Sequence, residues 1–275
     1  MPQEEKILNF DNALQAIEAI SNSFTVDAWI PSKQKMYSFK EIDANQQKNL
    51  LSSAINSSVY NTNFVKTFYH ILEENFVGEE KKEINSFTIF DKASIALALK
   101  SKISKEANII FDEDKENIKK INIISILKRF DSFQTPEPEN VELKNDENHI
   151  KLEIAVPTIG KEFDYEKEMH KKEKRVDDIK NTEDIQKILS EAFVGETSKY
   201  IQNIWINDTD INFNNFDFSK KIKIIEKLPS GLIQKILEIV SKWKKNYDEI
   251  LTVETVENES TYKKVLTIDS LLFLS

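Results

Sequence analysis

The stretch His149-Ile150-Lys151-Leu152-Glu153-Ile154-Ala155-Val156-Pro157 is the clearest strand signal in this chain. Apolar side chains recur at every second position from 150 to 156, which is the period of a strand with one buried face. The run stops at proline, which cannot donate a hydrogen bond to a neighbouring strand. Helical patterns stand on both sides of it. The sequence therefore predicts an α+β fold of mixed small sheets or hairpins with several amphipathic helices.

The chain upstream of this strand predicts a hairpin followed by three helices. Residues 24–30 and 36–39 are strand-like, and the segment 31–35 between them is typical of a turn. Three helix starts are indicated by capping residues, namely Asp43 with Gln46, Asn61, and Thr88 with Asp91. These elements form a first predicted module over residues 24–134. Residues 1–23 are an N-terminal extension, in which Asp11 precedes a short amphipathic helix formed by Ala13, Leu14, Ile17 and Ile20.

A second module is predicted over residues 141–275. Before this module, residues 108–125 fit two strands about a polar turn, although the second apolar patch could instead be helical, and the proline-rich segment 135–140 is the clearest linker. Beyond the opening strand, one helix is expected over 185–193 and another after Pro229. The remaining elements are two strands at 250–256 and 262–266 and a short apolar segment at 268–274.

Two nine-residue segments, 71–79 and 188–196, match each other at seven positions. A strand that ends in proline lies upstream of each, at Pro31 and at Pro157. Two explanations fit this match. Either the two halves of the chain are related modules, or two unrelated helices each end at a glycine. Both interpretations place Gly78 and Gly195 after the last turn of a helix, in the left-handed conformation that glycine tolerates best.

The composition is that of a globular, acidic chain without cysteine. Hydrophobic residues make up 40% of the 275 positions, which is enough for a sizeable core. The formal charge of −9 argues against broad attraction to nucleic acid or to an anionic membrane. Without cysteine there are no disulfides, thiolate metal ligands or cysteine nucleophiles. The acidic N-terminus and the absence of a long apolar run favour a soluble protein without a signal peptide.

No motif predicts catalysis. The four glycines are isolated, so the glycine-rich turns that bind phosphate groups cannot form in their usual way. His70, His149 and His170 do not pair at metal-ligand spacing, and we expect no ligand or catalytic role from them. The acidic segments 112–117 and 208–213 resemble calcium loops but lack the required glycine and glutamate. We therefore predict a protein that is not an enzyme, with no catalytic residue, cofactor or metal site.

Tryptophans are better candidates for a binding role, because buried aromatic side chains dominate both cores and interface hot spots. We expect Trp243 in the core. Trp205 stands among the polar residues of 202–207, and we take it as the candidate partner-binding residue. The basic residues of 167–175 alternate with acidic ones, which is typical of a solvated helix face.

Several segments occur in an order that points to a family. A strand that ends in Pro-Ser (24–32) precedes a second strand (37–42) and a helix with Lys and Leu (46–51). Further segments in the series are 86–92, 149–152, 228–236 and 265–274. In this order they resemble the baseplate hub family of T-even-type, contractile-tailed bacteriophages. The residues before Phe24 lie outside the resemblance.

The resemblance implies a tail-morphogenesis protein without catalytic residues. Such a protein is a component of the baseplate hub or a hub-assembly factor, and it binds other tail or hub proteins rather than nucleic acid or a membrane. Its expected location is the host cytoplasm during assembly or the tail baseplate of the virion. The residues leave three alternatives open, namely a soluble adaptor or chaperone unrelated to phage tails, an enzyme with dispersed acidic residues, and a nucleic-acid-binding protein.

Overall fold

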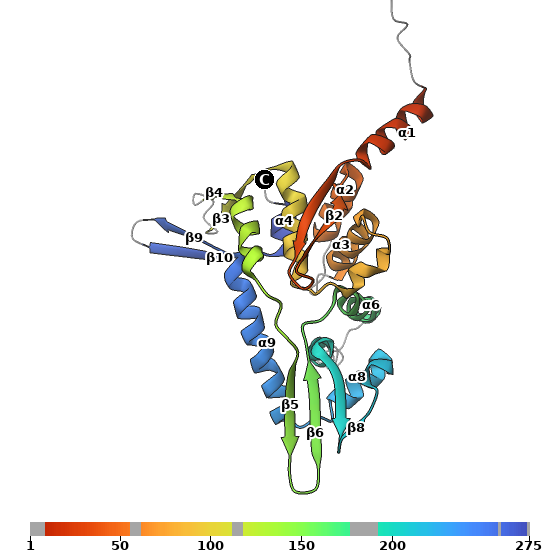
Figure 1. Ribbon diagram of the computed structural model, residues 1–275, viewed down its shortest axis with the longest axis vertical. Coiled ribbons are helices and arrows are strands. Elements are labelled where there is room, and N and C mark those ends of the chain that lie inside the picture. The colour runs from red at the N-terminus through yellow and green to blue at the C-terminus, as the bar shows by residue number, and fades with distance from the viewer. Residues whose placement is uncertain (1–8, 56–61, 112–117, 177–191, 258–259, 274–275) are drawn as a thin grey trace, which may run out of the picture.

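The computed structural model describes residues 9–55, 62–111, 118–176, 192–257 and 260–273 (Figure 1). Within these ranges the strands form four antiparallel sheets, three with two strands and one with four. Helices lie between and around these sheets. The predicted α+β class is confirmed.

The first hairpin pairs β1 (Thr25–Ile30) with β2 (Lys35–Lys40), as the sequence predicts. Alternate residues of β1 are buried, so one face of the hairpin contributes to the core. The helices α2 (Ala44–Ile55) and α3 (Thr62–Asn75) follow, and α2 begins with the expected reciprocal cap. The Gln46 backbone N–H donates to Asp43 Oδ1 at 2.7 Å, and the Asp43 backbone N–H donates to Gln46 Oε1 at 3.3 Å.

Asp91 ties the turn of this hairpin to the start of the central helix, α4 (Asp91–Ile103). Its carboxylate accepts hydrogen bonds from the backbone N–H of Thr88 at 2.5 Å and from the Thr88 hydroxyl at 2.9 Å. It also accepts from the backbone N–H and the hydroxyl of Ser32, at 2.9 and 2.5 Å. Burial nevertheless raises the pKa of this carboxyl, although all four hydrogen bonds favour its charged form. The predicted pairing of Thr88 with Asp91 is present, with Ser32 as a further partner, but the predicted helix start at Thr88 is wrong, because the N-cap of α4 is Phe90 and has no side-chain capping hydrogen bond.

α4 is the most deeply buried helix described, since every residue from Asp91 to Lys100 is buried. The 3-10 helix η1 (Lys81–Ser86) precedes it and a second hairpin follows, formed by β3 (Glu106–Ile110) and β4 (Ile118–Asn122). The helix α5 (Ile123–Leu127) and the 3-10 helix η2 (Lys128–Ser132) then lead into an extended segment. Two strands are present in the region predicted over 108–125, and the end of the second apolar patch is helical, as the first residues of α5.

The four-stranded sheet occupies the lower end of the molecule in Figure 1. Its order is β5 (Glu139–Lys144), β6 (His149–Ile154), β7 (Ile201–Ile206) and β8 (Thr209–Asp210), and β6 is the strand on which the α+β prediction rests. The long helix α9 (Ser230–Leu251) lies beside β5. Trp243 of α9 is buried, as predicted, and its indole N–H donates to Glu139 Oε1 at 3.1 Å.

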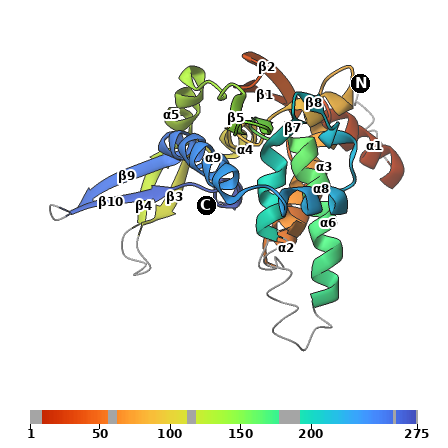
Figure 2. The ribbon, with the colours of Figure 1, turned by 90° about the horizontal axis from the view of Figure 1, so that it is seen from below.

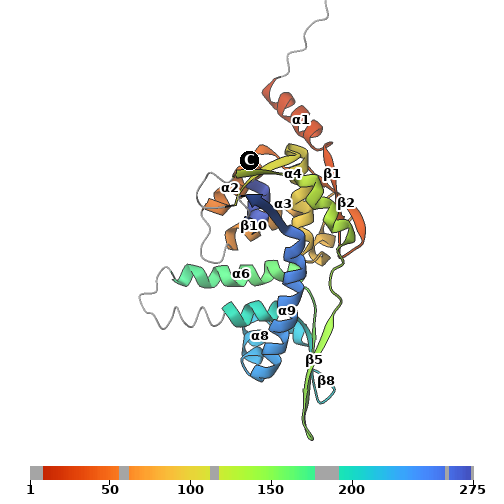
Figure 3. The same ribbon diagram turned by 90° about the vertical axis from the view of Figure 1, so that its left-hand side faces the viewer.

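Helices connect this sheet to the first half of the chain. α6 (Ile159–Val176) packs against α3 and η1, and Tyr69 stacks on Phe163 with ring centroids 3.9 Å apart. The helical residues 192–200, the 3-10 helix η3 (Phe213–Asn215) and α8 (Phe218–Ile225) complete this side of the molecule (Figure 3). Residues 185–191 of the predicted helix 185–193 lie outside the described residues, and its last two residues, 192 and 193, are helical.

The C-terminal elements return to the first half of the chain. β9 (Thr252–Glu257) and β10 (Ser260–Val265) form a hairpin beside β3 and β4 (Figure 2), where Lys264 Nζ donates to the Ile110 carbonyl at 2.9 Å. The last helix, α10 (Ile268–Phe273), packs on α4. One cluster of buried apolar side chains therefore extends through both predicted modules.

The predicted glycine caps are wrong, because no glycine has a positive φ. Gly195 lies inside the helical residues 192–200, where a Cβ atom would stand 2.8 Å from Cε2 of Tyr165. Gly195 therefore does not end a helix. Its lack of a side chain lets the helical residues 192–200 pack closely against Tyr165 of α6. Gly78 lies beyond the end of α3. In their described parts the two matched segments therefore have different structures, which removes the support that the match gave to a duplication.

Candidate functional site

The helix α1 (Phe10–Ser21) projects from the body of the molecule (Figures 1 and 3). The Asn9 side chain caps it by accepting a hydrogen bond from the Asn12 backbone N–H at 2.8 Å. The sequence predicts this helix, but with Asp11 before its first turn rather than within it. The N-terminal cap of α1 is thus formed by its own neighbouring residues. Because the helix projects from the body, its sides are exposed.

The apolar face of α1 is exposed. Phe10, Leu14, Ile17 and Ile20 recur at helical spacing and are 79%, 45%, 61% and 59% exposed, and no residue of the helix is buried. Ile103 and Val256 are also exposed, but each belongs to an element with buried residues, α4 and β9. We call the four side chains the α1 apolar face.

Physical chemistry makes this exposure costly. An isolated helix of about 12 residues is marginal in water, and most helices in proteins are stabilised by burial of their apolar face. Burying one fully exposed large apolar side chain contributes about 1.5–3 kcal/mol, so the four together, which are already partly covered, could contribute about 4–7 kcal/mol. Since α1 buries none of them against the described part of this chain, an external surface is the natural source of that burial.

The structure places the sequence candidate Trp205 elsewhere, on β7 of the four-stranded sheet. This sheet occupies the lower end of Figure 1, whereas α1 lies at the upper end. The strand neighbours of Trp205 are Lys151 and Asp210. It is half-buried, and Lys151 Nζ lies 5.2 Å from its ring centroid. Because side chains alternate along a strand, Trp205 points away from the buried Ile204, on the more open face of the sheet. It is accessible to a partner, but it belongs to a different surface from the α1 apolar face.

The other residues weighed in the sequence do not come together. His70 is exposed and lies 4.0 Å from Glu73, and His149 Nε2 lies 2.9 Å from Glu142 Oε2. Asp210 accepts hydrogen bonds from Asn203 and from the Asn212 backbone N–H, so it stabilises a turn. The side chain of His170 and the segment 112–117 lie outside the described residues. Among the described residues, no three His, Asp or Glu side chains are grouped closely enough to hold a metal ion.

A buried ionic network joins α4, α6 and the helical residues 192–200. Lys92 Nζ lies 2.5 Å from Glu162 Oε2, and Lys199 Nζ lies 2.6 Å from Glu196 Oε2. Burial alone would raise the pKa of Glu162, but the charges of Lys92 and Lys199 hold it below its ordinary value. Burial raises the pKa of the neighbouring Glu166 to about 7. Opposite charges meet directly in this network, which is the pattern of a structural ion-pair cluster.

No protein-family model matches this chain, and the searches of curated proteins and of solved structures also gave no match. Within the described ranges, no helix combines the length and hydrophobicity that a membrane span requires.

Sequence reasoning identified α1 as an amphipathic helix but did not select it as a binding element. The available signal was its isolation, because an apolar stripe in a helix of 12 residues needs a surface to pack on. The tertiary structure decides whether this stripe packs on the same chain or remains exposed. The exposure of the stripe could therefore be recognised only in the structure.

Proposed function

We propose that this protein is a non-catalytic component or assembly factor of the baseplate hub of a contractile phage tail, and that α1 is its main binding element. Two arguments support the proposal. The order of the sequence segments resembles the T-even-type baseplate hub family over most of the chain after residue 23. The α1 apolar face is exposed and lies before residue 24, outside the resemblance, and it is the observation that carries the proposed binding role.

The mode of binding follows from the geometry of α1. An amphipathic helix that projects from its own protein fits an apolar groove in another, with anchors at i, i+3, i+4 and i+7. Phe10, Leu14 and Ile17 supply anchors at this spacing. Asp11 and Glu18 are seven residues apart and lie along one edge of the apolar face. The expected partner is therefore a tail protein with an apolar groove and basic residues on one rim.

The test is quantitative mass spectrometry of purified virions and of immature tail intermediates from infected cells. Presence in both fractions at fixed stoichiometry would identify a structural hub subunit. Presence in the intermediates alone would identify an assembly factor. Absence from both fractions would overturn the proposal and favour an adaptor or chaperone outside phage tails.

A matched pair of variants tests the role of α1 in the same fractions. Leu14→Glu with Ile17→Glu places two charges in the apolar face, and we expect the protein to be lost from the tail fractions. A loss of about 3 kcal/mol in binding free energy would weaken the affinity for the partner by a factor of about 100. Gln15→Glu adds a charge on the polar side of the same helix and should be retained. Equal retention of both variants would show that α1 is not the binding element.

A further inference from the structure

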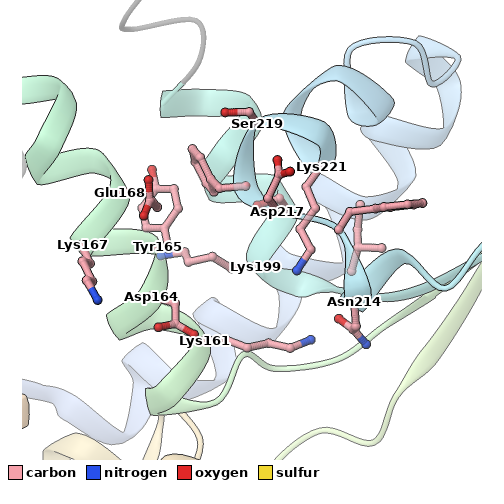
Figure 4. A pocket seen from close by; sticks show the side chains of 14 residues that line it. Lys161, Asp164, Tyr165, Lys167, Glu168, Lys199, Asn214, Asp217, Ser219 and Lys221 are labelled. Atoms are coloured by element: carbon pink, nitrogen blue, oxygen red, sulfur yellow. The ribbon is translucent and has the colours of Figure 1, made fainter.

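Lys161 of α6 and Lys221 of α8 extend into one pocket of about 500 Å³ (Figure 4). The pocket lies between α6, the residues 198–201 and the segment from η3 to α8. Figure 4 shows the two ammonium groups directed toward the same space, with the Asn214 side chain beside them. Three separate elements thus bring polar groups together at one place.

The hydrogen-bond partner of Lys161 and the ring partner of Lys221 are uncharged. Lys161 Nζ donates to Gln202 Oε1 at 2.6 Å, and Lys221 Nζ lies 5.5 Å from the ring centroid of Phe213. Among the described residues, neither has a carboxylate oxygen within 4.0 Å of its ammonium nitrogen. The pocket also contains acidic residues, but Glu168 pairs with Lys171 and Asp217 pairs with Lys220, and Asp164 is exposed.

Burial disfavours the charged form of both lysines. Burial lowers the pKa of Lys161 to about 8, and the charge of Lys221 acts in the same direction, with a smaller opposing effect from Glu153. Burial also lowers the pKa of Lys221, although Asp164 opposes it. Two partly buried cations without a paired carboxylate are costly in the free protein. An anion that binds between them would compensate both charges.

We propose that this pocket binds the phosphate group of a small molecule, held by Lys161 and Lys221, with the Asn214 amide as a neutral donor. A phosphate monoester carries about −1.5 to −2 charges at pH 7 and matches two ammonium groups, whereas a carboxylate carries one. The Asn214 amide donates one hydrogen to the Gln202 carbonyl at 2.6 Å and keeps a second for a ligand. The volume falls in the range of about 300–1,000 Å³ typical of small-molecule sites. This proposal does not depend on the assignment to a phage tail.

The experiment is isothermal titration calorimetry of the full chain with inorganic phosphate and, separately, with acetate, at constant ionic strength. The wild type should bind phosphate saturably and acetate about tenfold more weakly or not at all. Lys161→Met and Lys221→Met should each weaken phosphate binding by about tenfold or more. Lys223→Met, which removes an exposed lysine of the same helix, α8, should leave it unchanged.

Folding is checked by circular dichroism for each variant. Lys161→Gln keeps a hydrogen-bonding group opposite Gln202 and replaces Lys161→Met if that variant fails to fold. The proposal is overturned if the wild type shows no saturable phosphate binding, if acetate binds as tightly as phosphate, or if the folded Lys161 and Lys221 variants bind like the wild type.

Discussion

Glu166 is a buried carboxyl group in which desolvation outweighs favourable charge. Burial raises its pKa to about 7, and the opposing effect of Lys199 is smaller. The other charged groups that face it are Glu162 of α6, Glu196 of the helical residues 192–200 and Lys92 of α4. The folded protein therefore holds this proton more tightly than the unfolded chain, whose glutamate pKa is about 4.5. The stability that Glu166 contributes is present below about pH 4.5 and is lost as the pH rises to about 7.

Glu166→Gln should remove this dependence. We expect the free energy of unfolding at pH 8 to rise by about 1–3 kcal/mol, because no charge remains to be buried. The measurement is urea denaturation between pH 5 and pH 8. Glu168→Gln, on the same helix and in an exposed pair with Lys171, is the control and should change little. A Glu166→Gln variant less stable than the wild type at pH 8 would show that the charged form is favoured.

The Lys92–Glu162 pair is expected to be strongly coupled. Lys92→Met should destabilise the fold by about 3–5 kcal/mol, since it leaves a buried carboxylate without its closest cation. The double change Lys92→Met with Glu162→Leu should recover most of this loss. A double-mutant cycle of denaturation free energies measures the coupling, and additive single effects would argue against a direct buried pair.

At the scale of elements, α1 contrasts with α4. α4 is buried from Asp91 to Lys100, whereas no residue of α1 is buried. We expect the backbone amides of α1 to exchange hydrogen at least about tenfold faster than those of α4 in the free protein, because local opening of α1 exposes much less apolar surface than local opening of α4. Hydrogen exchange read by mass spectrometry resolves the two helices. Protection of α1 equal to that of α4 would mean that α1 is packed in the free protein.

The sequence was sufficient for elements whose signals are local. The alternation of β6, the reciprocal cap of Asp43 and Gln46, and the start of α9 after Pro229 were each predicted correctly. β7 was missed because its residues, Ile201 to Ile206, do not alternate strictly and become a strand by pairing with β6. Gly195 was misjudged because its role depends on the approach of Tyr165 from another helix. The two-lysine pocket was beyond sequence reasoning for the same reason, since Lys161 and Lys221 are 60 positions apart (221 − 161).

At the scale of the whole molecule, the two halves of the chain share one core. α10 packs on α4, and Leu271 of α10 is completely buried. Leu271→Ala should therefore lower the free energy of unfolding by about 2–5 kcal/mol and should destabilise both halves together. Urea denaturation followed by circular dichroism and by tryptophan fluorescence should give one coincident transition at a lower midpoint. Two separate transitions would mean that the halves unfold independently.

We propose that the shared core forms the body of the protein and that the exposed helix α1 is its binding element. Photo-crosslinking in infected cells tests this account most directly, with p-benzoylphenylalanine in place of Phe10 on the apolar face and, as a control, in place of Gln15 on the polar side. The account predicts that position 10 gives one dominant adduct, that the adduct contains a tail protein, and that position 15 gives much less of it. No adduct from position 10, or the same adducts from both positions, would contradict the account.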